Sequence, residues 1–196
     1  AYAPDPTTFA EAIGIRGELA PKVLDRVRDK LGREPVEDFR IGFQDGYGNR
    51  SDDEEDGHAT HAAQQVAAGL VASTLPPFIG IRIKPLTRDL AVRSLRTLDV
   101  FLTELVGSTN GRLPDNFVVT LPKIQSLTDI ETIVGVFDLL QDRLHLEAGA
   151  LRLEIMVETT QTIFDPQGRS ILPRLHRAAA GRMVSAHFGT YDYTAN

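Results

Sequence analysis

Five apolar, β-branched runs recur along the chain, and each one ends in polar or charged residues before a stretch with helical periodicity. They are FRIGFQD (39–45), FIGIRIK (78–84), FVVTLPK (117–123), LRLEIMVE (151–158) and MVSAHFGTYD (183–192). Their starts lie 39, 39, 34 and 32 residues apart, which fits one strand plus one crossover helix each time. This alternation predicts a parallel sheet covered by helices, with functional side chains at the C-terminal ends of the strands.

Apolar residues outside these runs recur at the helical spacing of three and four positions. The resulting stripes cover residues 23–31, 62–71, 91–105, 130–140 and 171–179. We expect a helix packed on the sheet at each stripe, and the first of these helices belongs to a helical N-terminal segment over residues 5–31. A short first strand is also expected near Tyr2-Ala3-Pro4.

The runs alternate in polarity, and this alternation bears on the type of sheet. In the fourth run Leu153, Ile155 and Val157 alternate with Glu154 and Glu158. Because successive strand residues face opposite sides, one face can meet helices while the other is mixed and partly charged. An open doubly wound sheet would be apolar on both faces, whereas the interior and mouth of a barrel accept charged side chains. The pattern therefore favours a barrel over an open sheet.

We predict an α/β chain of the (β/α)8 TIM-barrel type. The 196 residues hold only about six of the eight βα units that such a barrel needs. The prediction is accordingly a single barrel domain over residues 1–196, truncated at its C-terminus. Truncation at the N-terminus is expected as well, because the sequence starts with Ala1 rather than Met.

Composition narrows the classes of partner and chemistry. The formal net charge is −6 and no long basic stripe occurs, which argues against nucleic acid and anionic membranes as main partners. No apolar stretch approaches the roughly 20 residues of a membrane-spanning helix. Cysteine is absent, which excludes disulfides, thiolate metal sites and a cysteine nucleophile. We expect a cytoplasmic protein that acts on a small molecule.

Two carboxylates at the ends of neighbouring runs suggest a metal site. Glu158 ends the fourth run and Asp192 ends the fifth. Side chains at adjacent strand ends lie close enough to share one divalent cation, and two carboxylates plus waters and substrate oxygens suit Mg²⁺. The alternative is that each carboxylate caps the next helix or pairs with a nearby arginine.

Three cations at strand ends are candidates for substrate binding. Arg82 and Lys84 follow three isoleucines, and arginine is the residue suited to bidentate binding of a carboxylate. The alternative for Arg82 is a surface charge on an apolar stem. Lys123 occupies the matching place after the third run. A Schiff-base role is an alternative for it, but no residue pattern indicates the lowered pKa that this chemistry needs.

The first run ends in a turn that could approach a ligand. Gln44, Asp45 and Gly46 follow its last apolar residue, and glycine allows close approach of the backbone. Asp45 could hydrogen-bond a metal-bound water, or could simply form the turn. The acidic stretch at 52–56 lacks the final glutamate of a calcium-binding loop, since Ala63 stands there. We expect it to be a solvated loop that runs into the N-terminus of a helix.

The motifs at the strand ends, taken in order, resemble those of the citrate lyase β-subunit-like proteins in the HpcH/HpaI aldolase superfamily, the phosphoenolpyruvate/pyruvate-binding barrels. The resemblance runs from about Phe39 to the end. It rests on Gln44-Asp45-Gly46, Ile81-Arg82-Ile83-Lys84, Leu121-Pro122-Lys123-Ile124-Gln125-Ser126, Val157-Glu158-Thr159 and Phe188-Gly189-Thr190-Tyr191-Asp192-Tyr193. These look like the family's Glu-Asp-Gly, Val-Arg-Ile-Asn, Leu-Pro-Lys-Val-Glu-Ser, Ile-Glu-Thr and Phe-Gly-x-x-Asp-Tyr.

The resemblance implies a Mg²⁺-dependent carbon–carbon lyase or aldolase that acts on a 2-oxo acid or an acyl-CoA thioester through a metal-stabilised enolate. It puts metal binding on Glu158 and Asp192, substrate oxygens on Arg82 and an outer-shell role on Asp45; Mn²⁺ would also fit the site. We add Lys123 to Arg82 and Asp45 as candidate catalytic residues. The substrate-binding set is Arg82, Gln44, Gly46 and Lys84. A homo-oligomer is expected.

The sequence departs from the family pattern at two positions. Gln44 and Gln125 stand where relatives often carry glutamate. Glutamine keeps hydrogen bonding but cannot act as a base, which leaves the proton-transfer step unassigned. The alternative function is therefore a non-catalytic barrel, either a pseudoenzyme or a ligand-binding protein that has lost lyase activity.

Overall fold

The computed structural model describes residues 3–195. By its internal contacts the chain divides into two compact units, residues 1–38 and residues 39–196. The single barrel domain expected over residues 1–196 stays a prediction, and the two units are described separately below.

The first unit is a small helical unit. It contains α1 (Pro6–Ile13), a 3-10 turn (η1, Gly17–Leu19) and α2 (Ala20–Arg33). Asp5 begins α1 by accepting hydrogen bonds from the backbone N–H groups of Thr7 and Thr8 at 3.0 Å each, as an N-cap residue does. The helical segment expected over residues 5–31 is confirmed.

The apolar stripe of α2 packs partly on α1. Leu24 is buried in a cluster whose other members are Phe9, Ala10 and Ala20. Val27 and Leu31, predicted to share the packed face, lie outside this cluster. Of the expected strand near residues 2–4, Tyr2 lies outside the described residues, and Ala3 and Pro4 have no regular secondary structure.

The second unit is built on a five-stranded parallel sheet. The strands are β1 (Asp38–Gly42), β2 (Phe78–Arg82), β3 (Phe117–Leu121), β4 (Leu153–Val157) and β5 (Met183–Phe188), and their order in the sheet is the order in the chain. The predicted parallel order is therefore confirmed. Each strand ends before its predicted run does, so the polar ends of the runs lie in the connections. Closure into a barrel stays a prediction.

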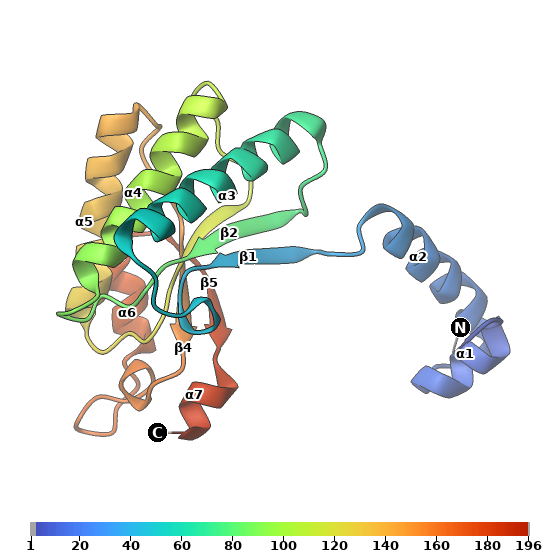
Figure 1. Cartoon of the computed structure of the whole chain (residues 1–196). Helices are drawn as coiled ribbons and strands as arrows, with labels where there is room; N and C mark the ends of the chain where they lie inside the picture. The colour runs from blue at the N-terminus through green and yellow to red at the C-terminus, as the bar shows by residue number, and fades with distance from the viewer. Residues whose placement is uncertain (1–2, 196) are drawn as a thin grey trace. The chain divides into compact units, whose positions relative to one another are not determined.

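Helices follow the strands and cover one face of the sheet. They are α3 (Asp52–Ala72), α4 (Ala91–Ser108), α5 (Leu127–Leu144) and α6 (Leu172–Ala178). Three short elements follow β1, β4 and β5, respectively: η2 (Asp45–Tyr47), η3 (Thr160–Thr162) and α7 (Thr190–Ala195). Figure 1 shows α3, α4 and α5 side by side over the same face. In a sheet wound in one direction only, successive crossovers place the helices on one side.

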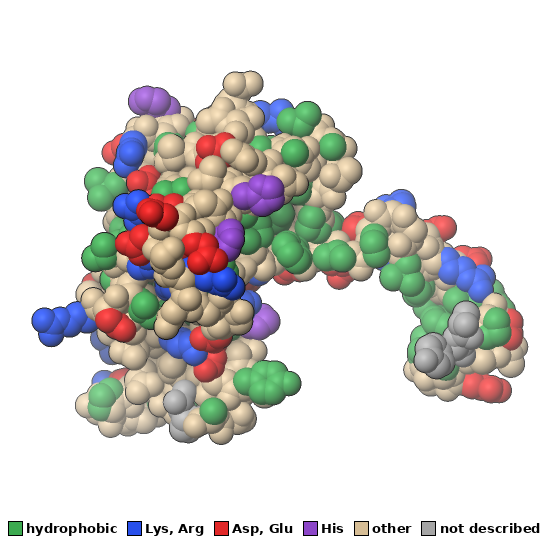
Figure 2. Space-filling model, viewed as in Figure 1, with side chains coloured by type: hydrophobic (Ala, Val, Ile, Leu, Met, Phe, Trp, Pro, Cys, Tyr) green, Lys and Arg blue, Asp and Glu red, His purple; other side chains and the backbone are tan. Residues whose placement is uncertain are grey.

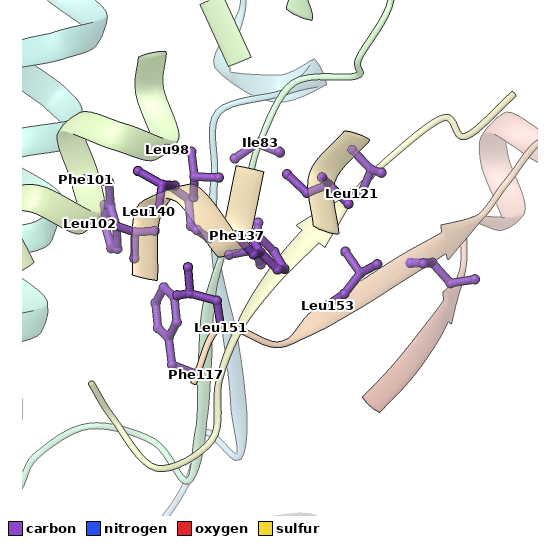
Figure 3. Packing of buried hydrophobic residues seen from close by; sticks show 14 of the residues in the cluster. Ile83, Leu98, Phe101, Leu102, Phe117, Leu121, Phe137, Leu140, Leu151 and Leu153 are labelled. Atoms are coloured by element: carbon purple, nitrogen blue, oxygen red, sulfur yellow. The ribbon is translucent and has the colours of Figure 1, made fainter. Parts of the chain in front are cut away.

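The main core lies between this face and the helices. Alternate strand residues such as Ile81, Val119 and Ile155 are fully buried against Phe101 and Phe137 of the helices, and Figure 3 shows part of this packing. The intervening strand residues project to the other face, which we call the open face. The predicted alternation of an apolar face with a mixed one is confirmed.

Charges on the surface are mixed in sign. Figure 2 shows acidic and basic side chains interspersed over the second unit on the face in view. Within residues 3–195, no helix combines the length and the apolar character needed to cross a bilayer.

Gly80 provides a test of the close packing on the open face. A Cβ added to it would lie 2.2 Å from the carbonyl oxygen of Val118 on β3, a distance that real Cβ atoms do not adopt. We expect Gly80→Ala to lower the free energy of unfolding by about 1–3 kcal/mol, the usual cost of overpacking. Gly135→Ala on α5, where the added Cβ meets nothing within 4 Å, should instead raise it by about 0.5–1 kcal/mol. Urea denaturation of both variants measures the difference, and equal stabilities would contradict the packing described for Gly80.

Candidate active site

Carboxylates that follow β1 and β5 converge on the ammonium group of Lys123, which follows β3. The Nζ of Lys123 donates to Oδ1 of Asp192, in α7, at 2.8 Å, and lies 3.3 Å from Oδ2 of Asp45, after β1. Burial alone would lower the pKa of Lys123, but the two carboxylates outweigh it and hold the pKa above its ordinary value. A charged lysine with two anionic partners does not favour Schiff-base chemistry.

The backbone of Lys123 has a second contact at this edge. Its φ angle is +49°, in the left-handed region that non-glycine residues seldom adopt. In this conformation its N–H donates to Oε1 of Glu158, after β4, at 2.7 Å. Uncommon backbone conformations of this kind are concentrated at functional sites. The hydrogen bond from Lys123 fixes one carboxylate oxygen of Glu158 and leaves the other available.

Glu158 is fully buried, and its second carboxylate oxygen has no hydrogen-bond partner. Oε2 is buried without a partner in the described part of the chain. A Cβ at Gly189 would lie 2.6 Å from this oxygen, so glycine at 189 leaves the space around it open. Burial, followed by the carboxyl group of Asp192 close by, raises the pKa of Glu158. The hydrogen bond from Lys123 holds the pKa of Asp192 below its ordinary value.

The pair Glu158 and Asp192 fits a divalent cation with oxygen ligands. The two carboxyl groups lie close enough for each to shift the pKa of the other, and their shared role as metal ligands stays a prediction. The unpartnered Oε2 of Glu158 would gain a partner from such an ion. Within residues 3–195 no group of three histidine, cysteine, aspartate or glutamate side chains is placed to hold a metal. Two carboxylates with remaining positions for water and substrate suit Mg²⁺ or Mn²⁺ better than Zn²⁺.

Arg82 ends β2 and shares the parity of Gly80, on the open face. It makes no ion pair with the residues that the structure describes, and its Nε is buried without a hydrogen-bond partner. A buried donor without a partner is costly to a folded protein. The buried Nε–H could donate to an oxygen acceptor, and the substrate-binding role expected for Arg82 stays a prediction.

A cleft of about 550 Å³ opens beside Asp45 and Lys123. Its lining includes Gln44, Asp45, Lys84 and Lys123, four of the residues singled out in the sequence. The side-chain amide of Gln44 donates to Oδ2 of Asp45 at 2.8 Å and so orients that carboxylate toward Lys123. Gly46 lies in the η2 turn, where an added Cβ would meet nothing within 4 Å, so the structure gives no packing reason for glycine there.

Lys84 turns its ammonium group toward the helical layer. Its Nζ donates to Oε2 of Glu55 on α3 at 2.7 Å and to the carbonyl oxygen of Phe43 at 2.8 Å. Glu55 also accepts from the hydroxyl of Thr97 at 2.6 Å and is almost completely buried. Lys84 thus lines the cleft while its charge is matched by a buried carboxylate.

The acidic stretch 52–56 differs from the sequence expectation. It forms the first turn of α3 after the N-cap residue Ser51 rather than a loop before the helix, and it is not fully solvated. Glu55 is buried, and Asp56 pairs with Arg93 and Arg96 of α4. The sequence alone could not show which acidic residues face α4, because the stretch contains five in a row.

Sequence reasoning missed a charge cluster in the middle of the open face. Both carboxylate oxygens of Glu154 on β4 are bonded to the guanidinium of Arg40 on β1, each at 3.1 Å. The hydroxyls of Thr120 and Ser185 donate to the same carboxylate at 2.7 and 2.8 Å. Burial would raise the pKa of Glu154, but these hydrogen bonds outweigh it and hold the pKa below its ordinary value. The alternation in the fourth run was the only signal for Glu154.

Comparison with protein families gives one match over the whole chain. The family described as "Domain of unknown function (DUF6986)" matches residues 1–196. No curated protein matches the sequence.

Solved structures with a similar fold are malate synthases. The native malate synthase of Haloferax volcanii at 3 mM glyoxylate matches with 13% identity and a TM-score of 0.55, covering 79% of this chain and 43% of that one. The pyruvate/acetyl-CoA ternary complex of the same enzyme matches with 14% identity and a TM-score of 0.50, covering 72% and 36%. The chain thus spans less than half of these proteins. At such identity the likeness is one of fold, and membership of the citrate lyase β family stays a prediction.

The buried carboxyl of Glu158 gives a prediction about pH. Because its pKa is raised in the folded state, its favourable contribution is complete below the ordinary pKa of 4.5 and is lost as pH rises through the raised pKa. Glu158→Gln keeps the shape of the protonated form. The metal-free variant should exceed the wild type in unfolding free energy by on the order of 1–3 kcal/mol at about pH 8, and by nothing at about pH 4.

Chemical denaturation with a chelator present, repeated across this pH range, measures the difference. Glu131→Gln, at an exposed position on α5, is the matched control and should show no such dependence on pH. A Glu158→Gln variant that is less stable than the wild type at pH 8 would contradict the raised pKa.

Proposed function

The chain belongs to the DUF6986 family, and we propose that it carries the metal and substrate site of an enzyme that makes or breaks a carbon–carbon bond next to a carbonyl group. Its substrates are a 2-oxo acid and an acyl-CoA thioester. The cofactor is Mg²⁺, for which Mn²⁺ can substitute. The reaction belongs to the aldolase and lyase class that the motifs imply.

One observation carries this proposal. Two buried polar atoms of opposite character, Oε2 of Glu158 and Nε of Arg82, lack partners in the described part of the chain. They belong to residues at the C-terminal ends of β4 and β2, where parallel strands place functional side chains. A bound cation would complete the coordination of the first atom, and an anionic substrate would accept from the second.

The residues have separate tasks in this proposal. Glu158 and Asp192 hold the divalent cation, which when bound would polarise a substrate carbonyl as a Lewis acid. The guanidinium of Arg82 binds the carboxylate of the 2-oxo acid through two parallel hydrogen bonds. Lys123 fixes Glu158 with its N–H and balances the charge of Asp45 and Asp192 with its ammonium group.

The substrate class is supported by the names of the structural neighbours, which mention glyoxylate in one case and pyruvate with acetyl-CoA in another. In the synthetic direction a proton leaves the α-carbon of the thioester, and this carbon forms the new bond to the carbonyl carbon of the oxo acid. The carbonyl oxygen receives a proton, and hydrolysis of the thioester releases CoA. Cleavage is the reverse of the bond-forming step. No residue is assigned as the general base that takes the proton from the α-carbon.

The alternative is a binding protein of the same fold without turnover. Gln44 and Gln125 support it, because amides replace carboxylates that could act as bases. Gln44 is bonded to Asp45, and the backbone N–H of Gln125 donates to Asp129, so neither residue replaces the missing base. The expected homo-oligomeric state and cytoplasmic location stay predictions.

Release of free CoA separates the two functions. Acetyl-CoA would be incubated with glyoxylate or pyruvate and Mg²⁺, and new thiol would be read with a thiol-reactive dye. The chain has no cysteine, so the protein adds no background. Turnover that requires Mg²⁺ supports the enzyme. Saturable binding of pyruvate without turnover supports the binding protein, and an absence of both overturns the proposal.

Metal affinity should depend on pH through Glu158. Its raised pKa means that the proton must leave before the cation binds, so affinity for Mn²⁺ should rise with pH through that pKa and then level off. Glu158→Gln should remove binding, whereas Glu131→Gln should leave it unchanged. Titration calorimetry with Mn²⁺ at several pH values measures this. An affinity that stays constant across the pH range would show that Glu158 is not a ligand.

Binding of the oxo acid should require the planar guanidinium of Arg82, which can donate two parallel hydrogen bonds. Arg82→Lys keeps the charge but loses the bidentate geometry, which should cost on the order of 2–3 kcal/mol in kcat/KM for the oxo acid. Arg88→Lys, on an exposed position six residues later, is the matched control. An unchanged kcat/KM for Arg82→Lys would assign Arg82 a structural role only.

A further inference from the structure

A row of four side chains crosses the open face of the sheet just below the strand ends. The Cα partners in the ladder are Arg82 with Thr120, Thr120 with Glu154, and Glu154 with Ser185. Residues paired across a ladder project to the same face. Arg82 and Glu154 therefore share one face of the sheet and are separated only by the strand that carries Thr120.

The carboxylate of Glu154 already accepts four hydrogen bonds, two on each oxygen. Oε1 accepts from Nε of Arg40 and the hydroxyl of Thr120, while Oε2 accepts from a terminal nitrogen of Arg40 and the hydroxyl of Ser185. Two bonds on each oxygen approach the limit of about four lone-pair sites of a carboxylate. Only 7% of the residue is exposed. Glu154 thus has little capacity left for Arg82.

Arg40 reaches Glu154 by crossing the sheet from β1 to β4, and Gly80 on β2 makes this crossing possible. A Cβ at Gly80 would lie 3.2 Å from the Cδ of Arg40. The side chain of Arg40 therefore passes over β2 at Gly80, where the absence of a side chain leaves room for it. If arginine can span from β1 to β4, Arg82 on β2 can span the shorter distance to the same carboxylate.

These contacts bear on why Arg82 makes no ion pair with the described residues. A cation beside a buried carboxylate on the same face would ordinarily pair with it, since an unpaired buried charge is costly. We propose that Arg40 is a positioning residue: by saturating Glu154, it keeps the guanidinium of Arg82 available for an anionic substrate. This inference rests on the proposed function for the affinity it predicts, but its effect on Arg82 itself can be measured without substrate.

The direct test is the reactivity of Arg82 toward phenylglyoxal, a dicarbonyl reagent that labels accessible guanidinium groups, read by peptide mass mapping. In Arg40→Met the buried Glu154 loses its cation, Arg82 turns to it, and labelling of Arg82 should fall by at least about fivefold. In Arg40→Met/Glu154→Met no carboxylate remains to attract Arg82, so labelling should return to the wild-type level. Replacing a buried ion pair with apolar side chains of similar size is often tolerated, which makes the double variant a fair comparison.

Two further variants separate positioning from loss of structure. Arg40→Lys retains a cation for Glu154 and should leave the labelling of Arg82 close to that of the wild type. Arg40→Gln removes the charge with a smaller change in shape, and it replaces Arg40→Met if that variant does not fold. Labelling of Arg82 that is unchanged in the folded single variant, or that stays low in the double variant, would overturn the inference.

Binding of pyruvate in the presence of Mg²⁺, measured by titration calorimetry, gives the functional readout. Arg40→Met should weaken it at least about tenfold, the double variant should recover to within about threefold, and Arg82→Met should abolish it in either background. If the wild type does not bind pyruvate while the labelling follows the expected pattern, the proposed substrate class fails and the role of Arg40 stands. If pyruvate binds but Arg40→Met affects neither readout, the role of Arg40 fails alone.

Discussion

Alternation along the strands governs this fold, because helices cover only one face of the sheet. Successive residues of β2, β3 and β4 project to opposite faces, so every second side chain packs under α3 to α6 and the others need different partners. Aliphatic and aromatic residues pack on the helix-covered face. The open face carries a mixture that includes glycine, threonine and charged residues. The site at the strand ends continues this second face, which is why it is polar.

Two buried ion pairs solve different problems in the same sheet. Lys84 and Glu55 join the end of β2 to α3, and they fasten the helical layer beside the cleft. Arg40 and Glu154 join β1 to β4 across the open face, at the level of Arg82. Buried pairs contribute little net stability compared with apolar packing but are costly when one partner is removed. Their effect is to fix where charge lies near the strand ends, where Nε of Arg82 and Oε2 of Glu158 lack partners in the described part of the chain.

Several features of the site could be predicted from local pattern. Glu158 and Asp192 follow adjacent strands of a parallel sheet, so their convergence follows from strand order alone. The face to which Arg82 projects follows from its parity with Gly80. Other features could not be predicted in this way. The left-handed backbone of Lys123 is not encoded by a residue type that favours it, and the side-chain partners of Lys84 and Glu154 lie 29 to 114 positions away in the chain.

The sequence by itself determined the order of the five strongly patterned strands, their parallel direction and the face of each strand that meets helices, because period and alternation are local properties of a chain. Tertiary structure alone decided which acid pairs with which base. Asp52 to Asp56 read as one solvated stretch, yet Glu55 is buried and Asp56 binds α4, since the rotation of α3 against its neighbour selects the partners. The same holds at Glu154: its place on the mixed face is local, but its four hydrogen bonds exist only when β3 and β5 lie beside β4 and Arg40 reaches across the sheet from β1.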